Sequence, residues 1–156
     1  MKSTPPSVPL QVQVVVDCAE PHVLADWWAE TLGWRVEHQD EDFIRSMIEQ
    51  GFATEGDDTT VHNGKLVWRG ATAIGPDTTT GAGQPRLLFQ QVPEAKSVKN
   101  RVHLDLRHDR DSDFDLAAFR AWLIERGGTE VGGGQQGPHQ WVTFADPEGN
   151  EFCVDV

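Results

Sequence analysis

The order of predicted secondary structure occurs twice along this chain of 156 residues, and this repeat constrains the fold more than any other feature. A valine-rich alternating strand, LQVQVVVDC (10–18), precedes a helical pattern that ends at Gly33. A second alternating strand, RVHLDLR (101–107), precedes another helical pattern over 112–128. Three further strands are predicted after each helix.

Each half of this repeat would expose one face of its sheet if it folded alone. The halves also contain similar local sequence patterns, in which a helix is followed by glycine and a strand: LADWWAETLGWRV (24–36) and LAAFRAWLIERGGTEV (116–131). The length suits one compact unit built from both halves. We therefore predict an α+β fold of two βαβββ modules, whose curved mixed sheets enclose one cavity.

Polar, proline-rich or glycine-rich stretches set the predicted boundaries. The predicted units are a flexible N-terminus (1–9), a first module (10–92), a linker (93–100) and a second module (101–156). Together they are expected to form one domain.

Several local predictions follow from turn residues and periodicity. Apolar residues at helical spacing predict a short inserted helix over about 40–51. The turn-rich stretch 53–64 is expected to be a loop, and 65–74 a single strand. In the second module, the glycine-rich stretch 132–139 is expected to be a loop, and Ser112 or Asp113 to cap the helix.

The net charge of −12 argues against nucleic acid or an anionic membrane as a partner. A cationic small molecule fits this charge, and so does an ordinary solvated acidic surface. No apolar run reaches membrane-spanning length, and the N-terminus lacks the apolar stretch of a signal peptide. Cys18 and Cys153 lie far apart in sequence, so we expect free thiols in a reducing cytoplasm.

Three stretches carry a resemblance to a known superfamily: DCAEPHVLADWWAETLGW (17–34), PRLLFQQVPEAKSVKNRVHLDLR (85–107) and ADPEGNEFCV (145–154). Over roughly residues 10–156 the chain resembles the vicinal oxygen chelate superfamily, and within it the glyoxalase-like proteins related to bleomycin-resistance proteins. The resemblance implies the doubled βαβββ fold and a homodimer. It leaves function open, because this scaffold serves isomerases, lyases, dioxygenases, fosfomycin-type resistance enzymes and metal-free drug binders.

Metal-using members of the superfamily place four ligands, two in each half. The resemblance puts Gln13, either Gln90 or Gln91, His103 and Cys153 at these positions. Neutral amides are weak ligands, and this set lacks the carboxylate usual at the position of Cys153. We therefore expect no family-type metal and no other cofactor; the alternative is a divalent zinc, nickel, iron or manganese ion.

Strand alternation gives each sheet a polar face opposite its valine and leucine rows. The residues predicted to bind a ligand on these faces are Gln11, Gln13, Gln90, Gln91, Arg101, Glu151 and Cys153. His103 and Asp105 are the catalytic candidates, because residues two apart on a strand share a face and a carboxylate orients an imidazole. A solvent-facing sheet with a structural histidine is the simpler alternative.

Two classes of function fit these residues. The first is a binding module that holds a small molecule, cationic or aromatic, in the cavity without the full metal set. The second is an enzyme of the lyase, isomerase or dioxygenase type. It would act either through His103 and Asp105 or through a metal held by His103, Glu151 and water. A structural partner with a filled pocket is the third reading, and the sequence does not name the ligand.

Overall fold

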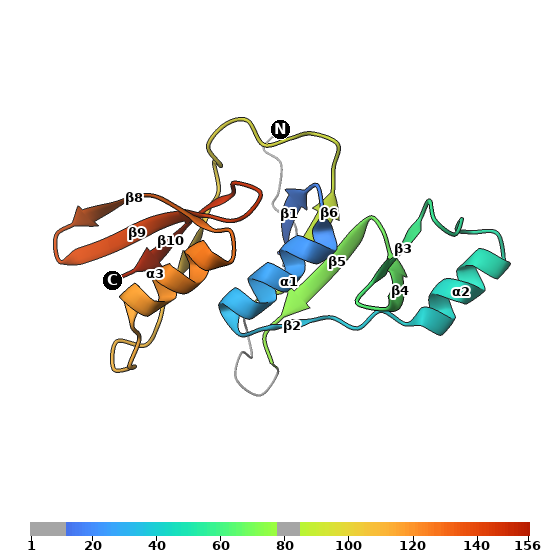
Figure 1. The fold of residues 1–156 in the computed structure, drawn as a ribbon, viewed down its shortest axis with the longest axis horizontal. Coiled ribbons are helices and arrows are strands. Elements are labelled where there is room, and N and C mark those ends of the chain that lie inside the picture. Colours follow the sequence, from blue (N-terminus) through green and yellow to red (C-terminus); the bar gives the residue numbers. More distant parts are fainter. Residues whose placement is uncertain (1–11, 78–84) are drawn as a thin grey trace, which may run out of the picture.

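The computed structural model describes residues 12–77 and 85–156, so the N-terminus that was predicted to be flexible (1–9) lies outside the described residues. In chain order the elements are β1 (Val14–Cys18), α1 (Pro21–Leu32), β2 (Arg35–Val36), α2 (Glu41–Glu49), β3 (Thr59–His62), β4 (Lys65–Trp68), β5 (Ala71–Gly75), β6 (Leu87–Gln91), β7 (Leu104–Leu106), α3 (Leu116–Glu125), β8 (Thr129–Gln136), β9 (His139–Ala145) and β10 (Glu151–Asp155). Figure 1 shows two helix-and-sheet units side by side, with α2, β3 and β4 at the end remote from α3.

Both modules have the same strand order. The first sheet runs β1-β6-β5-β2 and the second β7-β10-β9-β8, each with one parallel pair at the edge and antiparallel pairs elsewhere. The helices α1 and α3 each follow the edge strand of their own sheet. This arrangement confirms the predicted α+β fold with two βαβββ modules and mixed sheets.

Helix α1 joins the two modules into one core. Pro21 stands in its first turn, and Gly33 ends it in the left-handed conformation (φ 65°), which glycine adopts without steric cost. Its buried Trp27 and Trp28 both contact the ring of Phe152 in the second module edge to face. The apolar cluster around them includes residues from both sheets, so the two modules share one core.

The turn between β9 and β10 fastens this interface with hydrogen bonds. Asp146 is buried and accepts from Trp28 Nε1 (3.0 Å) as well as from the backbone N–H groups of Glu148 and Asn150. The carboxylate of Glu148 accepts from the backbone N–H groups of residues 19 and 20, immediately before α1. The Asp-Pro-Glu-Gly-Asn stretch is therefore a clamp between modules as well as a hairpin turn.

The stretch between β2 and β6 differs from its prediction in two respects. Its helix α2 begins after Asp40, whose side chain caps two backbone N–H groups, and it falls within the predicted 40–51. However, the stretch predicted as a loop contains β3, and the strand predicted over 65–74 is split into β4 and β5. Asn63 and Gly64 both have positive φ and form a two-residue hairpin turn between β3 and β4, a signal that the loop prediction overlooked.

The second module also departs from two predictions. The glycine-rich stretch 132–139 is not a loop, because β8 continues through it to Gln136 in a ladder with β9. The cap of α3 is Asp115, which accepts from the backbone N–H groups of Ala117 and Ala118, whereas Ser112 and Asp113 lie ahead of the helix.

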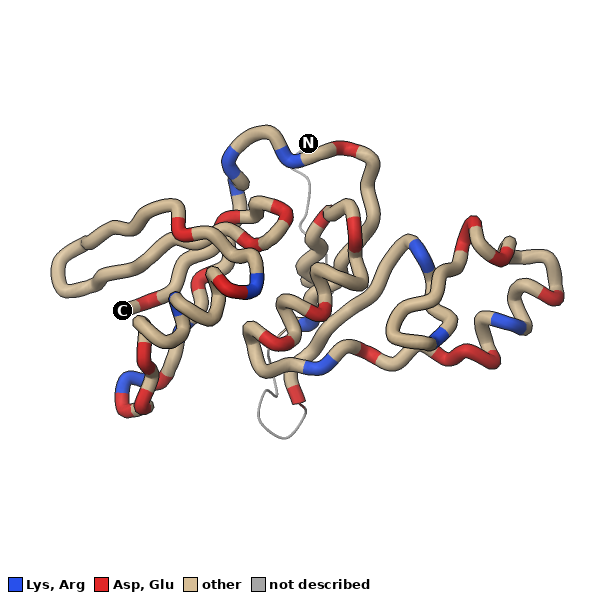
Figure 2. Tube along the Cα trace, viewed as in Figure 1, with Lys and Arg blue, Asp and Glu red and all other residues tan. Residues whose placement is uncertain are grey.

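Neither the distribution of acidic residues nor the apolar character of the helices indicates a particular partner. Figure 2 shows acidic residues spread over both modules instead of gathered in one patch. None of the helices in the described ranges has the length and apolar character that a membrane span requires.

Candidate functional site

The two neighbouring glutamines at the end of β6 point to opposite faces of the first sheet. Gln90 is exposed and is the parallel partner of Asp17, so it lies on the face opposite α1. Gln91 points the other way, and its Nε2 donates to the carbonyl of Ala19 (3.0 Å). The structure thus assigns Gln90, and not Gln91, to the polar face.

The side-chain amide oxygen of Gln13 accepts a hydrogen bond from the guanidinium group of Arg86. Arg86 Nε donates to Gln13 Oε1 (2.9 Å), and Arg86 Nη1 forms an ion pair with Glu37 Oε2 (2.7 Å). A cation bound to this oxygen makes Gln13 a poor partner for a second cation. The remaining predicted glutamine, Gln11, lies outside the described residues.

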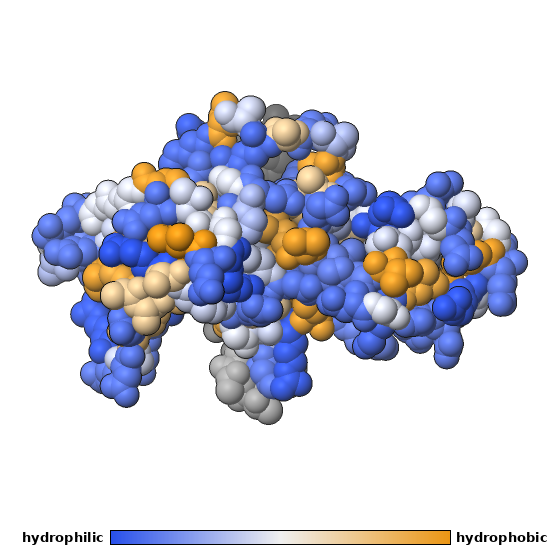
Figure 3. All heavy atoms as spheres, in the orientation of Figure 1, coloured by the Kyte–Doolittle hydropathy of each residue, from blue (hydrophilic) through white to orange (hydrophobic). Residues whose placement is uncertain are grey.

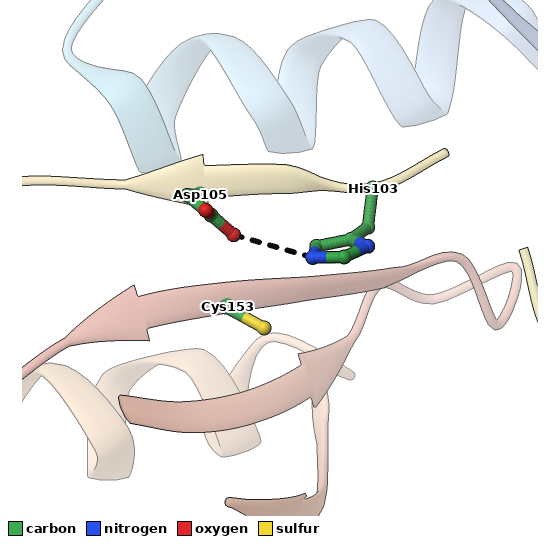
Figure 4. Close-up of side chains that lie close together, drawn as sticks. All are labelled: His103, Asp105 and Cys153. Atoms are coloured by element: carbon green, nitrogen blue, oxygen red, sulfur yellow. Dashed lines mark ion pairs between the residues drawn. The ribbon is translucent and has the colours of Figure 1, made fainter. Parts of the chain in front are cut away.

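The polar face of the second sheet brings together three residues that the sequence singled out. Asp105 on β7 lies directly opposite Cys153 on β10, because the two strands pair in parallel register. His103 lies two residues before Asp105, and its Nε2 is 3.4 Å from Asp105 Oδ1. Figure 4 shows both side chains turned toward one another beside Cys153. On the other side, Thr143 Oγ1 on β9 is 3.6 Å from Cys153 Sγ.

A hollow of about 490 Å³ lies over this face, and we call it the C-terminal hollow. Its lining residues are Lys99, His103, Asp105, Arg107, Gln136, His139, Trp141, Thr143, Glu151, Cys153 and Asp155. The side chains of His103 and Asp105 are 42% and 46% exposed, so both can reach a solute. Sequence reasoning missed Thr143 and Gln136, since the pairing of β9 with β8 and β10 is needed to place them. It also missed Lys99, which belongs to the linker before β7.

The indole of Trp141 lies against the glycine-rich strand. Trp141 is the antiparallel partner of Gly134, and a Cβ built on Gly134 would fall 2.3 Å from Trp141 Cζ2. Trp141 also pairs with Asp155, so it shares the polar face with Cys153 two residues earlier on β10. The glycines of β8 therefore make room for an aromatic side chain beside the polar cluster.

Glu151 and Arg101 have other surroundings than the sequence suggested. The carboxylate of Glu151 accepts from the backbone N–H of Asn100 and from Lys96 Nζ, both at 3.0 Å. Burial raises the pKa of this carboxyl, but these hydrogen bonds outweigh burial and bring the pKa down to about 2. Glu151 thus anchors the linker, while Arg101 is exposed and does not line the C-terminal hollow.

A second hollow, of about 670 Å³, lies between β1 of the first module and the linker and β7 of the second. It is lined by residues 14–17 of β1, by Trp28 and by residues 94–104 of the linker and β7. Gln13 and Gln90 line neither this hollow nor the C-terminal one. Within the described residues of one chain, the two sheets form no closed barrel, and a single cavity enclosed by both stays a prediction.

The two cysteines are free thiols in different environments. Burial, together with the nearby charges of Glu148 and Asp146, raises the pKa of Cys18 to about 12. Cys18 is therefore an unreactive core residue. Cys153 is half-buried and opens onto the C-terminal hollow.

Comparison with known families agrees with this architecture. The model of a glyoxalase-like domain matches residues 13–155, which include both modules. The chain belongs to this family of glyoxalase-like domains. A comparison with curated proteins finds no similar sequence.

Solved structures of glyoxalase-like and related proteins share the fold at low sequence identity. A mutant of the fosfomycin resistance protein FosX from Listeria monocytogenes, complexed with Mn(II) and a dihydroxypropylphosphonic acid, is 7% identical, with a TM-score of 0.59 over 96% of this chain and 92% of that one. A glyoxylase/bleomycin resistance protein/dioxygenase domain from Frankia is 12% identical, with a TM-score of 0.57 over 96% and 92%. An enzyme of the glyoxalase/bleomycin resistance protein/dioxygenase family from Burkholderia phytofirmans is 10% identical, with a TM-score of 0.56 over 92% of this chain and 94% of that one.

The residues of this glyoxalase-like domain do not fit the superfamily's four-ligand metal set. The amide oxygen of Gln13 already accepts a hydrogen bond from Arg86, and neither Gln13 nor Gln90 lines the hollow that contains His103 and Cys153. Two neutral amides also contribute no charge to offset the desolvation of a divalent ion. We therefore derive no chemistry from a metal held by these four residues.

Proposed function

We propose that this glyoxalase-like domain binds a small organic molecule in the C-terminal hollow, without the superfamily's four-ligand metal set. The observation that carries the proposal is the hollow itself. Its volume of about 490 Å³ falls in the range of small-molecule sites, which is roughly 300–1,000 Å³. An aromatic side chain and several polar groups converge on it, a combination typical of binding sites.

The lining favours a ligand with an aromatic ring and a cationic or donor group. The indole of Trp141 offers a flat apolar surface for a ring. Asp105 pairs with an imidazole, while Asp155 already pairs with Arg107 (3.2 Å), so Asp105 is the carboxylate better placed to receive an ammonium. The net charge of −12 also attracts cations from solution.

A panel of aromatic amines tests the proposal. Chelator-treated protein is titrated by calorimetry, and Trp141→Phe and Asp105→Asn are each expected to weaken the binding of any hit. Asp17→Asn is the matched control, because Asp17 is an exposed carboxylate on the polar face of the other sheet. Equal losses in Asp17→Asn and Asp105→Asn would point to nonspecific charge attraction and contradict a site in the C-terminal hollow.

Acid–base catalysis in the same hollow is the second candidate function. It is favoured by the 3.4 Å approach of His103 Nε2 to Asp105 Oδ1, with both groups accessible. A carboxylate in this position orients the ring of a general base, as isomerase or lyase chemistry requires. If a hit from the panel is turned over, His103→Gln should abolish turnover and leave binding largely intact. Unchanged turnover would exclude His103 as the base.

The proposal includes a homodimer. β1 and β7 stand at the edges of their sheets, and edge strands with free backbone groups invite a partner. On the helices, Val23 is 59% and Ile124 52% exposed, and Figure 3 shows several separate apolar patches on the face that it displays. A second copy could cover such surfaces and help close the open sheets. Sedimentation showing a monomer at micromolar concentration would contradict this.

We also propose the reducing cytoplasm as the setting of the protein. Both cysteines are free, and Cys153 opens onto the proposed binding site as a thiol. Fractionation of cells producing the full-length protein checks this location.

A further inference from the structure

The polar face of the second sheet gathers three metal-type donors within a single module. One ligand atom each from His103, Asp105 and Cys153 can be chosen so that all lie within 4.8 Å of one another. They supply an imidazole nitrogen, a carboxylate oxygen and a sulfur. No residue of the first sheet takes part in this cluster.

The spacing suits a small tetrahedral ion. Zinc bonds of about 2.0–2.3 Å place neighbouring ligand atoms about 3.3–3.8 Å apart. His103 Nε2 and Asp105 Oδ1 already lie at 3.4 Å. The remaining contraction falls on exposed or half-buried side chains, while the paired strands β7 and β10 keep Asp105 opposite Cys153.

We propose that His103, Asp105 and Cys153 form a zinc-type cation site that differs from the superfamily's four-ligand set. Zinc takes nitrogen, sulfur and carboxylate ligands, and three protein ligands leave a fourth position for water or a solute. A thiolate disfavours the hard ions magnesium and manganese. The thiolate and the carboxylate together balance the ion's charge, which the two amides of the four-ligand set cannot do.

The neighbouring groups support this assignment. Thr143 Oγ1, 3.6 Å from Cys153 Sγ, is placed to donate a hydrogen bond to a thiolate. Glu151 is held by Lys96 and Asn100, so the fourth position stays open toward the C-terminal hollow. The site goes beyond the proposed function, since the hollow and its aromatic wall exist with or without an ion.

Cobalt(II) titration of the chelator-treated full chain, in a thiol-free reductant, tests the site. We expect one equivalent to give thiolate-to-cobalt charge-transfer absorption and the visible bands of a tetrahedral ion. Zinc should displace the cobalt, and manganese or magnesium should not. Cys153→Ser should abolish the charge-transfer absorption, whereas Cys18→Ser, at the buried thiol, should retain it.

Variants of the other ligands decide between this site and the four-ligand set. His103→Ala and Asp105→Asn should each weaken cobalt binding by at least about 10-fold, since losing even an outer partner of a ligand costs about that much. Gln13→Ala and Gln90→Ala should leave affinity unchanged. If either glutamine variant bound cobalt more weakly than wild type while Asp105→Asn kept wild-type affinity, the proposal would be overturned in favour of the four-ligand set.

Folding and ligand binding are followed separately. The three ligand side chains are exposed or half-buried, so circular dichroism should show each variant folded. Folded wild-type protein without cobalt absorption would overturn the site. The aromatic-amine titration uses chelator-treated protein, so its outcome reports on the proposed function independently of the ion.

Discussion

The two modules share one strand order but differ in what their polar faces carry. On the first sheet, Arg86 binds the amide of Gln13 and the carboxylate of Glu37, so polar groups satisfy one another. On the second sheet, His103, Asp105 and Cys153 cluster at the edge of a hollow. The fold decides which positions meet on a face of the sheet. The side chains at those positions decide whether the face can bind a ligand or only pairs its own polar groups.

The modules also play unequal parts in the shared core. The first module contributes Trp27 and Trp28 of α1. The second contributes the buried Asp146, whose carboxylate accepts a hydrogen bond from Trp28 Nε1. The C-terminal module therefore carries both the polar cluster and the interface clamp. This asymmetry can be tested by substitutions that have a matched position elsewhere in the chain.

The largest effect is expected from Asp146→Ala. The substitution leaves the buried Trp28 Nε1 without an acceptor and removes the hydrogen bonds that shape the β9–β10 turn. We expect a loss of about 3 kcal/mol in the free energy of unfolding, measured with urea. Asp113→Ala, at an exposed position, should change it by less than about 0.5 kcal/mol. A loss below about 1 kcal/mol in Asp146→Ala would mean that the modules are held together by apolar packing and by the hydrogen bonds of Glu148, and not by Asp146.

Gly134→Ala should come next. Its Cβ would overlap the indole of Trp141, and we expect overpacking of about 2 kcal/mol with a change in the near-ultraviolet circular dichroism of tryptophan. Gly70→Ala is the control in the first module, because a Cβ there meets nothing within 4 Å. If both substitutions changed the free energy of unfolding by similar small amounts, the position of the Trp141 indole would not depend on the absence of a side chain at Gly134.

These glycines also mark where sequence reasoning fell short. Glycine runs between polar residues usually indicate a loop, but β8 uses them to seat a partner's side chain, and only the pairing with Trp141 reveals this. The dipeptide Asn63-Gly64 is a hairpin signal in itself, so the turn between β3 and β4 can be predicted from sequence. The doubled element order was readable, because periodicity is a local property.

The candidate site was predictable in part for the same reason. Alternation on a single strand places His103 beside Asp105, and the structure brings them to 3.4 Å. Register between strands is not local, so the sequence alone could not place Thr143 against Cys153 or decide between Gln90 and Gln91. Nor could it show that Arg86 binds Gln13 across 73 residues of sequence.

The pH dependence of stability should report on the linker at Glu151. Its folded-state pKa of about 2 lies below the ordinary 4.5, so its contribution is complete above about pH 4.5 and is lost as pH falls toward 2. Urea unfolding of wild type and Glu151→Gln should differ by on the order of 1–2 kcal/mol at pH 6, and by less at pH 3. A difference that grows on acidification would contradict the hydrogen bonds from Lys96 and Asn100.

The smallest effect compares two glutamates at the start of α1. Glu20 is the N-cap of α1 by position but makes no side-chain capping bond, while Glu148 of the other module accepts from the backbone N–H groups of Ala19 and Glu20. The carboxylate also lies near the positive end of the helix dipole. Glu148→Ala should therefore cost about 1 kcal/mol in the free energy of unfolding, and Glu20→Ala much less. Glu148→Gln separates the causes, since it keeps an acceptor and removes the charge, so an intermediate loss that shrinks in high salt is expected. If Glu20→Ala were the costlier change, α1 would be capped by its own module, and the clamp would be limited to Asp146.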